Sequence, residues 1–101
     1  MRYLMLSADW GIPSVIENDD QAWSSVREEI HPELVAAIVA WNEDYQPIVP
    51  LDSNDRLARR PRIEELDRVG LWLAGRLEAS LGVCKVEYHS EGELRRLPRL
   101  R

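Results

Sequence analysis

The sequence predicts a small α+β fold: a small antiparallel sheet formed by N- and C-terminal strands, with two main helices packed on one face. Three observations predict this class. An apolar run over residues 3–8 and an alternating segment over residues 84–89 are typical of strands. Between them, two long segments have apolar residues at helical spacing. The 101 residues suffice for one domain, which we expect to span residues 1–101.

The N-terminal part of the chain is expected to form a strand, a turn and a short helix. Both alternating sets of residues 3–8 are largely apolar, which suits an interior strand. A turn with Gly11 follows, and residues 15–16 are expected to return as a short strand. Residues 22–30 are expected to form a short helix that buries Trp23.

Two main helices are expected in the middle of the chain. Pro32 stands at the first position of one helix, where its missing N–H is not needed, and a second proline ends this helix. The other helix opens at Pro61 and ends at Gly82, a residue suited to the left-handed conformation after a helix. Between the helices we expect a short extended piece at residues 48–51 and a polar connection at residues 52–60.

The C-terminal part is expected to form two strands. Cys84, Val86 and Tyr88 alternate with polar residues, as in a strand with one buried face. A turn at residues 90–93 and a last short strand near residues 94–97 follow. We expect the first and last strands of the chain to pair, which gives the predicted sheet.

Acidic and basic residues are unevenly distributed between the two halves of the chain. Residues 3–55 contain eleven acids and one basic residue, whereas residues 56–101 contain eleven basic residues and seven acids. A strongly acidic surface attracts cationic partners and speeds encounter with them. We therefore expect the acidic half to bind a basic protein, with tryptophans as anchors, and a merely solvated surface is the alternative. The expected binding residues are Trp10, Glu17, Asp19, Asp20, Trp23, Glu28, Glu29, Glu43 and Asp44.

Two other groups of residues are candidates for chemical sites. Glu17, Asp19 and Asp20 supply oxygens for a divalent cation, but their spacing lacks the periodicity of a calcium loop. Cys84 is interpreted as a small buried hydrophobe rather than as a nucleophile activated by one of the two histidines. The sequence has no phosphate-binding glycine loop and no nucleophile elbow. We therefore expect no enzymatic activity, no cofactor and no metal.

The C-terminal arginines are a candidate for phosphate contacts. They are Arg95, Arg96, Arg99 and Arg101. A chain with a net charge of −5 is a poor general binder of nucleic acid. Solvation, or intramolecular pairing with the acidic half, is therefore the favoured interpretation.

Length and composition also predict where the protein acts. The apolar run after Met1 is shorter than the core of a signal peptide, which has about 7–15 residues. No segment approaches the roughly 20 apolar residues of a membrane span. One cysteine excludes an intrachain disulfide. We therefore expect no membrane association and a cytoplasmic location.

Several short segments, spread over most of the chain, form a pattern found in a known family. They are Leu6-Ser7-Ala8-Asp9, Trp41-Asn42 with Tyr45, Ile48 and Leu51, then Leu66-Asp67, Gly70-Leu71 and Leu73-Ala74, and Tyr88 with Ser90-Glu91-Gly92. In these segments the chain resembles small immunity proteins of bacterial polymorphic-toxin and contact-dependent inhibition loci. The segments are structural in character, and none is a catalytic signature.

The resemblance implies a cognate inhibitor that binds a toxin domain and blocks its active site or a nearby surface. A nuclease toxin has a cationic cleft, so an acidic inhibitor would imitate nucleic-acid phosphates, which agrees with the charge pattern. Binding residues do not transfer, because immunity surfaces vary with the toxin. Two alternatives stay open: a regulatory or scaffolding domain without enzymatic activity, with a homodimer formed through sheet edges, and a small nucleic-acid-binding protein using the C-terminal arginines.

Overall fold

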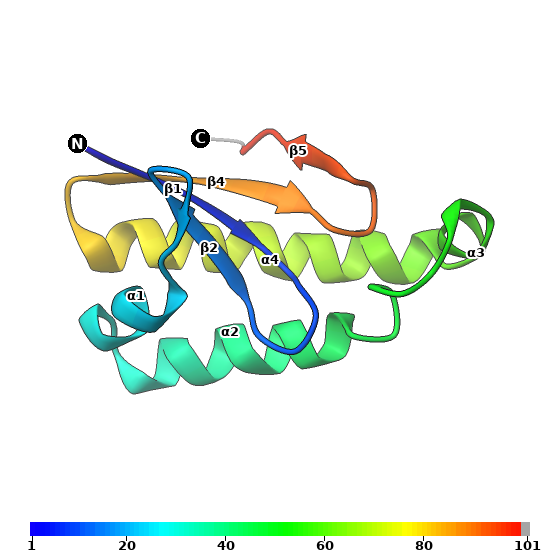
Figure 1. Cartoon of the computed structure of the whole chain (residues 1–101), viewed down its shortest axis with the longest axis horizontal. Coiled ribbons are helices and arrows are strands. Elements are labelled where there is room, and N and C mark those ends of the chain that lie inside the picture. The colour runs from blue at the N-terminus through cyan, green and yellow to red at the C-terminus, as the bar shows by residue number, and fades with distance from the viewer. Residues whose placement is uncertain (100–101) are drawn as a thin grey trace.

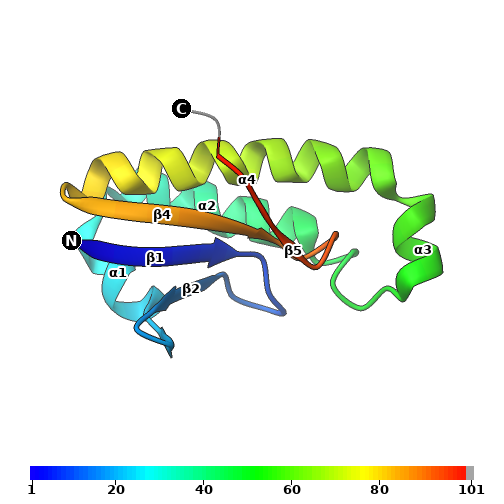
Figure 2. The same ribbon diagram turned by 90° about the horizontal axis from the view of Figure 1, so that it is seen from above.

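A five-stranded sheet with helices on one face is formed by residues 1–99, which the computed structural model describes. The elements are β1 (Arg2–Ser7), β2 (Ser14–Glu17), β3 (Asp20–Gln21), α1 (Trp23–Glu29), α2 (Pro32–Tyr45), α3 (Ser53–Ala58), α4 (Arg60–Leu81), β4 (Cys84–Ser90) and β5 (Arg95–Leu97). The strand order is β3-β2-β1-β4-β5. Figures 1 and 2 show α1, α2 and α4 on the same side of the sheet, which confirms the α+β class and the two layers.

The central strand pair, β1 and β4, is parallel, so the sheet is mixed and the prediction of an antiparallel sheet is wrong. The first strand pairs with β4 and not with the last strand, β5, so the expected pairing of the first and last strands is also wrong. In the β1–β4 pair Arg2 lies beside Cys84, and Ser7 lies beside His89. The path of the connection explains the direction. Strand β2 returns the chain to the start of β1, α2 leads it away again, and α4 returns it, so β4 begins at the same end as β1 (Figure 1). The outer pairs are antiparallel.

The two main helices have the predicted positions. Helix α2 begins at Pro32, and the side chain of His31 caps it by accepting a hydrogen bond of 3.1 Å from the amide of Glu33. Its buried face has the expected helical spacing of apolar residues and also includes Asn42, and consists of Leu34, Ile38, Trp41, Asn42 and Tyr45. Helix α4 ends at Leu81, and Gly82 follows with φ of +81°. This angle belongs to the region that glycine adopts without the steric cost of a Cβ atom.

The segment between the two main helices differs from the prediction. Residues 46–50 form turns rather than an extended piece. Residues 53–58 form α3 rather than a polar connection, because the carboxylate of Asp52 accepts a hydrogen bond of 2.9 Å from the amide of Asp55 and caps the helix. Helix α3 lies wholly within the described residues and buries no side chain, so apolar periodicity could not indicate it.

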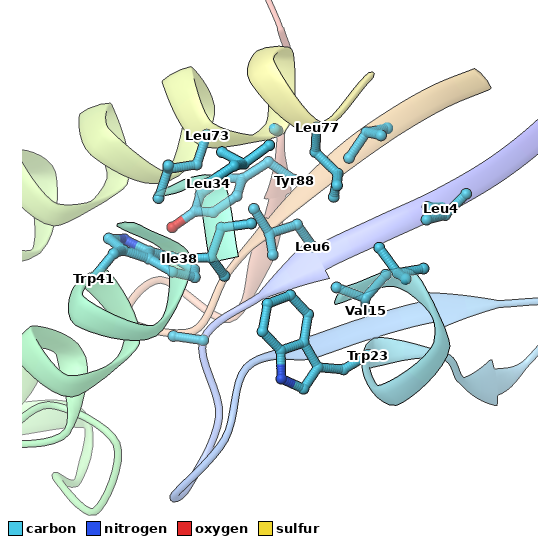
Figure 3. Close-up of a cluster of buried hydrophobic side chains, with 14 of the residues drawn as sticks. Leu4, Leu6, Val15, Trp23, Leu34, Ile38, Trp41, Leu73, Leu77 and Tyr88 are labelled. Carbon is cyan, nitrogen blue, oxygen red and sulfur yellow. The ribbon is translucent and has the colours of Figure 1, made fainter. Parts of the chain in front are cut away.

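The core fills the space between the sheet and helices α1, α2 and α4. Figure 3 shows Leu4 and Leu6 of β1 facing the side chains of the helices. The indole nitrogen of Trp41 donates a hydrogen bond of 2.9 Å to the carbonyl oxygen of Leu66, which joins α2 to α4. A Cβ atom at Gly70 would overlap the ring of Tyr88, so glycine at this position of α4 permits close packing against β4. The layers are therefore held in one fixed arrangement.

Candidate protein-interaction surface

The connection between β1 and β2 displays two large apolar side chains to solvent. Trp10 is 68% exposed and Ile12 is 59% exposed. Pro13, by contrast, is buried and leads the chain back into the sheet. We name residues 9–12 the Trp10 loop. Exposed tryptophan is the residue type most often found to dominate the energy of protein interfaces, so this loop is the first candidate for a binding surface.

Side chains of α2 hold the Trp10 loop in position. The side-chain oxygen of Asn42 accepts a hydrogen bond of 2.9 Å from the amide of Asp9. The side chain of Gln46 accepts one of 2.9 Å from the amide of Gly11 and donates one of 2.7 Å to the carbonyl oxygen of Asp9. Gly11 has φ of +78°, which disfavours a side chain there. The loop is thus ordered before any partner binds, which lowers the entropy cost of binding.

Two carboxylates stand at an unfavourable place on α2, in the turn whose Asn42 bonds to the Trp10 loop. Glu43 and Asp44 are exposed in the last turn of α2, and no basic residue stands in that turn. The C-terminal end of a helix has a negative partial charge, so an anion there destabilises the helix by about 0.3–1 kcal/mol. Within residues 1–99 neither carboxylate forms an ion pair. Glu43 and Asp44 are therefore uncompensated acids at the end of the helix that holds the Trp10 loop.

Two of the expected binding residues are held inside an ion-pair cluster at the other end of β1. The guanidinium of Arg2 donates to both carboxylate oxygens of Glu17, at 2.8 and 3.0 Å, and to those of Glu29, at 2.9 and 3.2 Å. The hydrogen bond from Arg2 lowers the pKa of Glu17 below its ordinary value. This cluster links α1 to the sheet, and Arg2 compensates the charges of Glu17 and Glu29, so both contribute less to an acidic surface than their number suggests.

Asp19 and Asp20 lie at the tip of the β2–β3 hairpin and are exposed. Asn18 and Asp19 have φ of 54° and 65°, as in the two-residue turns that suit Asn and Asp. The preference of this turn for Asn and Asp is thus sufficient to explain why an aspartate stands at position 19. The hairpin tip and exposed Glu28 lie at the Arg2 end of the sheet, roughly 23 Å from the Trp10 loop by the rise of a strand. The predicted single acidic surface is therefore two separate surfaces.

Trp23 is buried by the short helix α1, as expected, so the prediction that it also serves as an anchor at the surface is wrong. Its side chain is only 3% exposed and points into the core between α1 and the sheet (Figure 3). The guanidinium of Arg27 lies 5.7 Å from the ring centroid. The reason is the short amphipathic turn of α1, which buries Trp23 and Val26 together. Of the two expected tryptophans, only Trp10 is available to a partner.

A buried polar cluster around Asp67 was not predicted. Asp67 is 3% exposed on α4. Its oxygen Oδ1 accepts hydrogen bonds from the hydroxyls of Tyr45, at 2.9 Å, and Tyr88, at 2.6 Å, while Oδ2 accepts one of 2.7 Å from Ser90. The amide of Gly92 in turn donates to the hydroxyl of Tyr45, at 2.8 Å. The cluster connects α2, α4, β4 and the turn after β4.

The Asp67 cluster has the character of a structural site. Burial raises the pKa of Asp67, and the three hydroxyl donors only partly offset this effect. Each donor of the cluster is already satisfied inside the core, so none is free to act on a substrate. A carboxylate within the apolar stripe of α4 is the signal that could have indicated the cluster from sequence.

Three other side chains with reactive groups are Ser7, His89 and Cys84. The Ser7 hydroxyl donates to the carbonyl of Ala8, at 3.2 Å, and lies 3.4 Å from Nδ1 of His89, which is long for a working dyad. Cys84 is buried, and burial raises the pKa of its thiol, as expected for a small hydrophobe. Among residues 1–99 no three His, Cys, Asp or Glu side chains are grouped to hold a metal ion.

The C-terminal arginines form intramolecular pairs. Arg95 pairs with Glu93, Arg96 with Glu87, and Arg99 with Glu78, at 3.2, 3.0 and 2.7 Å. These acids belong to the C-terminal half, so the expected pairing with the acidic half does not occur for these three arginines. Arg101 lies outside the described residues.

Comparisons of the chain with protein-family models, with curated proteins and with solved structures found no match. In residues 1–99, no helix combines the length and the apolar character required to cross a bilayer.

Proposed function

We propose that this protein is an immunity protein that binds a cationic bacterial toxin domain, of nuclease type, and neutralises it by covering its active site. The Trp10 loop is the centre of the binding surface, with Trp10 and Ile12 as apolar anchors. Asp9, Glu43 and Asp44 provide the negative field around them. The protein acts in the cytoplasm and performs no chemistry of its own.

The observation behind this proposal is the combination of an exposed tryptophan with uncompensated acids on a preordered loop. Trp10 and Ile12 are exposed. Burial of a large apolar side chain would stabilise the fold by about 1.5–3 kcal/mol, and this stabilisation is absent here. Placing Glu43 and Asp44 at the negative end of α2 costs further stability. Residues that break local stability rules are expected at functional sites. An apolar anchor within acids suits a pocket bordered by arginine or lysine.

The test uses the toxin domain encoded beside the gene of this protein. We expect a one-to-one complex that abolishes toxin activity and whose association rate falls as salt is added, because screening weakens the attraction between the charged surfaces. The double charge reversal Glu43→Lys/Asp44→Lys should slow association by at least tenfold. Surface plasmon resonance at low and high salt measures both effects.

The matched control is Asp19→Lys/Asp20→Lys, which makes the same charge change at the hairpin tip. This variant should reduce the association rate much less, because its charges lie at the far end of the sheet. If the neighbouring toxin domain stays fully active with an excess of this protein, the proposed function is wrong. If the hairpin variant loses more affinity than the α2 variant, the binding surface is misplaced.

A further inference from the structure

The outward face of α4 exposes a second tryptophan. Trp72 is 61% exposed and Val69, one turn earlier, is 44% exposed. The guanidinium of Arg76 lies 6.0 Å from the centroid of the Trp72 ring. Helix α4 is 22 residues long, which is roughly 33 Å. A long helix with an aromatic and an arginine on its free face has the residue types that dominate protein interfaces.

Trp72 stands between two hollows. One hollow, of about 510 Å³, lies between α2 and α4 and is bordered by Glu33, Trp72 and Arg76. The other, of about 630 Å³, lies between α4 and the segment after β5, where Gly75 and Arg99 border it. Because Trp72 belongs to both, its side chain is a ridge with a depression on each side. Packed helices fit together when the ridges of one enter the grooves of the other.

The hollow between α2 and α4 also contains opposite charges. Glu33 and Arg76 both border it, and within residues 1–99 neither forms an ion pair with another residue. A twofold interface joins the same patch of two copies, so it requires a patch that carries both a ridge and a hollow, and both an acid and a base. In such a pair each Arg76 faces the Glu33 of the other copy.

We propose that the partner of this face is a second copy of the chain, packed α4 against α4 about a twofold axis. Trp72 of each copy enters the hollow between α2 and α4 of the other, and two Glu33–Arg76 pairs flank the contact. A homodimer through sheet edges is less suitable, because edge strands β3 and β5 have two and three residues. Such short edges offer few backbone groups for pairing. The proposal does not depend on the toxin-binding function.

The first measurement is sedimentation velocity of the purified protein over a range of concentrations. We expect reversible dimerisation with Kd of about micromolar, as for interfaces at the small end of the size range. Trp72→Ala should weaken dimerisation at least tenfold. The control is Trp10→Ala, which removes an equally exposed tryptophan from a different surface and should leave the dimer unchanged. Circular dichroism shows that each variant is folded.

The decisive measurement mixes two charge variants. Glu33→Arg alone and Arg76→Glu alone should both be monomeric, because each places like charges opposite each other. Their equimolar mixture should form heterodimers, because both pairs then join opposite charges. A monomer at all concentrations of the natural protein would overturn the proposal, and so would a dimer that Trp72→Ala leaves intact. A mixture that stays monomeric would show that Glu33 and Arg76 do not meet across a twofold axis.

Discussion

The C-terminal end of α2 contributes side chains to two groups of hydrogen bonds, one inside the core and one at the surface. Tyr45 points inward and bonds to Asp67, which lies in the core. Asn42 and Gln46 bond to the backbone of the Trp10 loop, which presents an exposed tryptophan. The first cluster joins elements to each other, whereas the second fixes a surface that contributes little to the core. The difference separates residues that stabilise this fold from those available for binding.

The largest effect on the free energy of unfolding is expected from a substitution in the Asp67 cluster. Asp67→Ala should lower the free energy of unfolding by about 3 kcal/mol or more, because three buried hydroxyl donors lose their acceptor and an unsatisfied buried group costs about 1–3 kcal/mol. Urea denaturation measures the change. Asp67→Asn, which keeps one acceptor oxygen and the volume, should cost much less. Equal losses in both variants would show that charge, not hydrogen bonding, holds the cluster.

A substitution in the Trp10 loop should instead reduce binding and leave the free energy of unfolding almost unchanged. Trp10→Ala is expected to weaken binding to the proposed toxin partner by about 2 kcal/mol, roughly 30-fold, as for a tryptophan hot spot. Its effect on unfolding should stay within about 0.5 kcal/mol, because the side chain is exposed. Isothermal titration calorimetry and urea denaturation measure the two quantities. Trp72→Ala is the matched control and should bind the toxin normally. A large loss of stability in Trp10→Ala would remove the contrast between the clusters.

A smaller loss of binding is expected from a substitution of Gln46, which follows α2 and bonds to the Trp10 loop. Gln46→Ala removes one donor and one acceptor from the Trp10 loop but no apolar anchor. Binding should weaken by about 1 kcal/mol, because the loop must then be ordered during association. The loss should be small when Trp10 is already alanine, so a double-mutant cycle tests whether Gln46 acts through Trp10. Additive losses in that cycle would mean that Gln46 contacts the partner directly.

The smallest expected effect is the change in the free energy of unfolding with pH that arises from the titration of Asp67. Burial raises the pKa of Asp67 above its ordinary value of 3.8. Between 3.8 and the raised value, the folded state binds more protons than the unfolded chain, so the free energy of unfolding falls as pH rises through this window. Glu17, whose pKa is lowered, contributes stability that is lost as pH falls. Asp67→Asn should therefore gain stability relative to the natural protein as pH rises, in urea denaturation across the window. A constant difference would contradict the raised pKa.

The sequence alone determined the parts of this protein that depend on local pattern. Apolar periodicity and the prolines at helix starts placed α2 and α4, and alternation placed β4, because these signals come from residues within one or two turns of each other. The acidic character of the N-terminal half was likewise visible. Charge counts, however, do not say which carboxylates are neutralised. Arg2 removes Glu17 and Glu29 from the candidate surface across 15 and 27 positions of sequence.

Only the tertiary structure decided the direction of β4 and the assembly of the Asp67 cluster. Each depends on contacts between segments far apart in the chain: β4 is parallel to β1 because two helices carry the chain out and back. Asp67 is stable in the core because Tyr45, Tyr88 and Ser90 arrive from other elements to donate to it. Local pattern shows which residues prefer burial, whereas packing decides which polar groups meet and which tryptophan remains exposed.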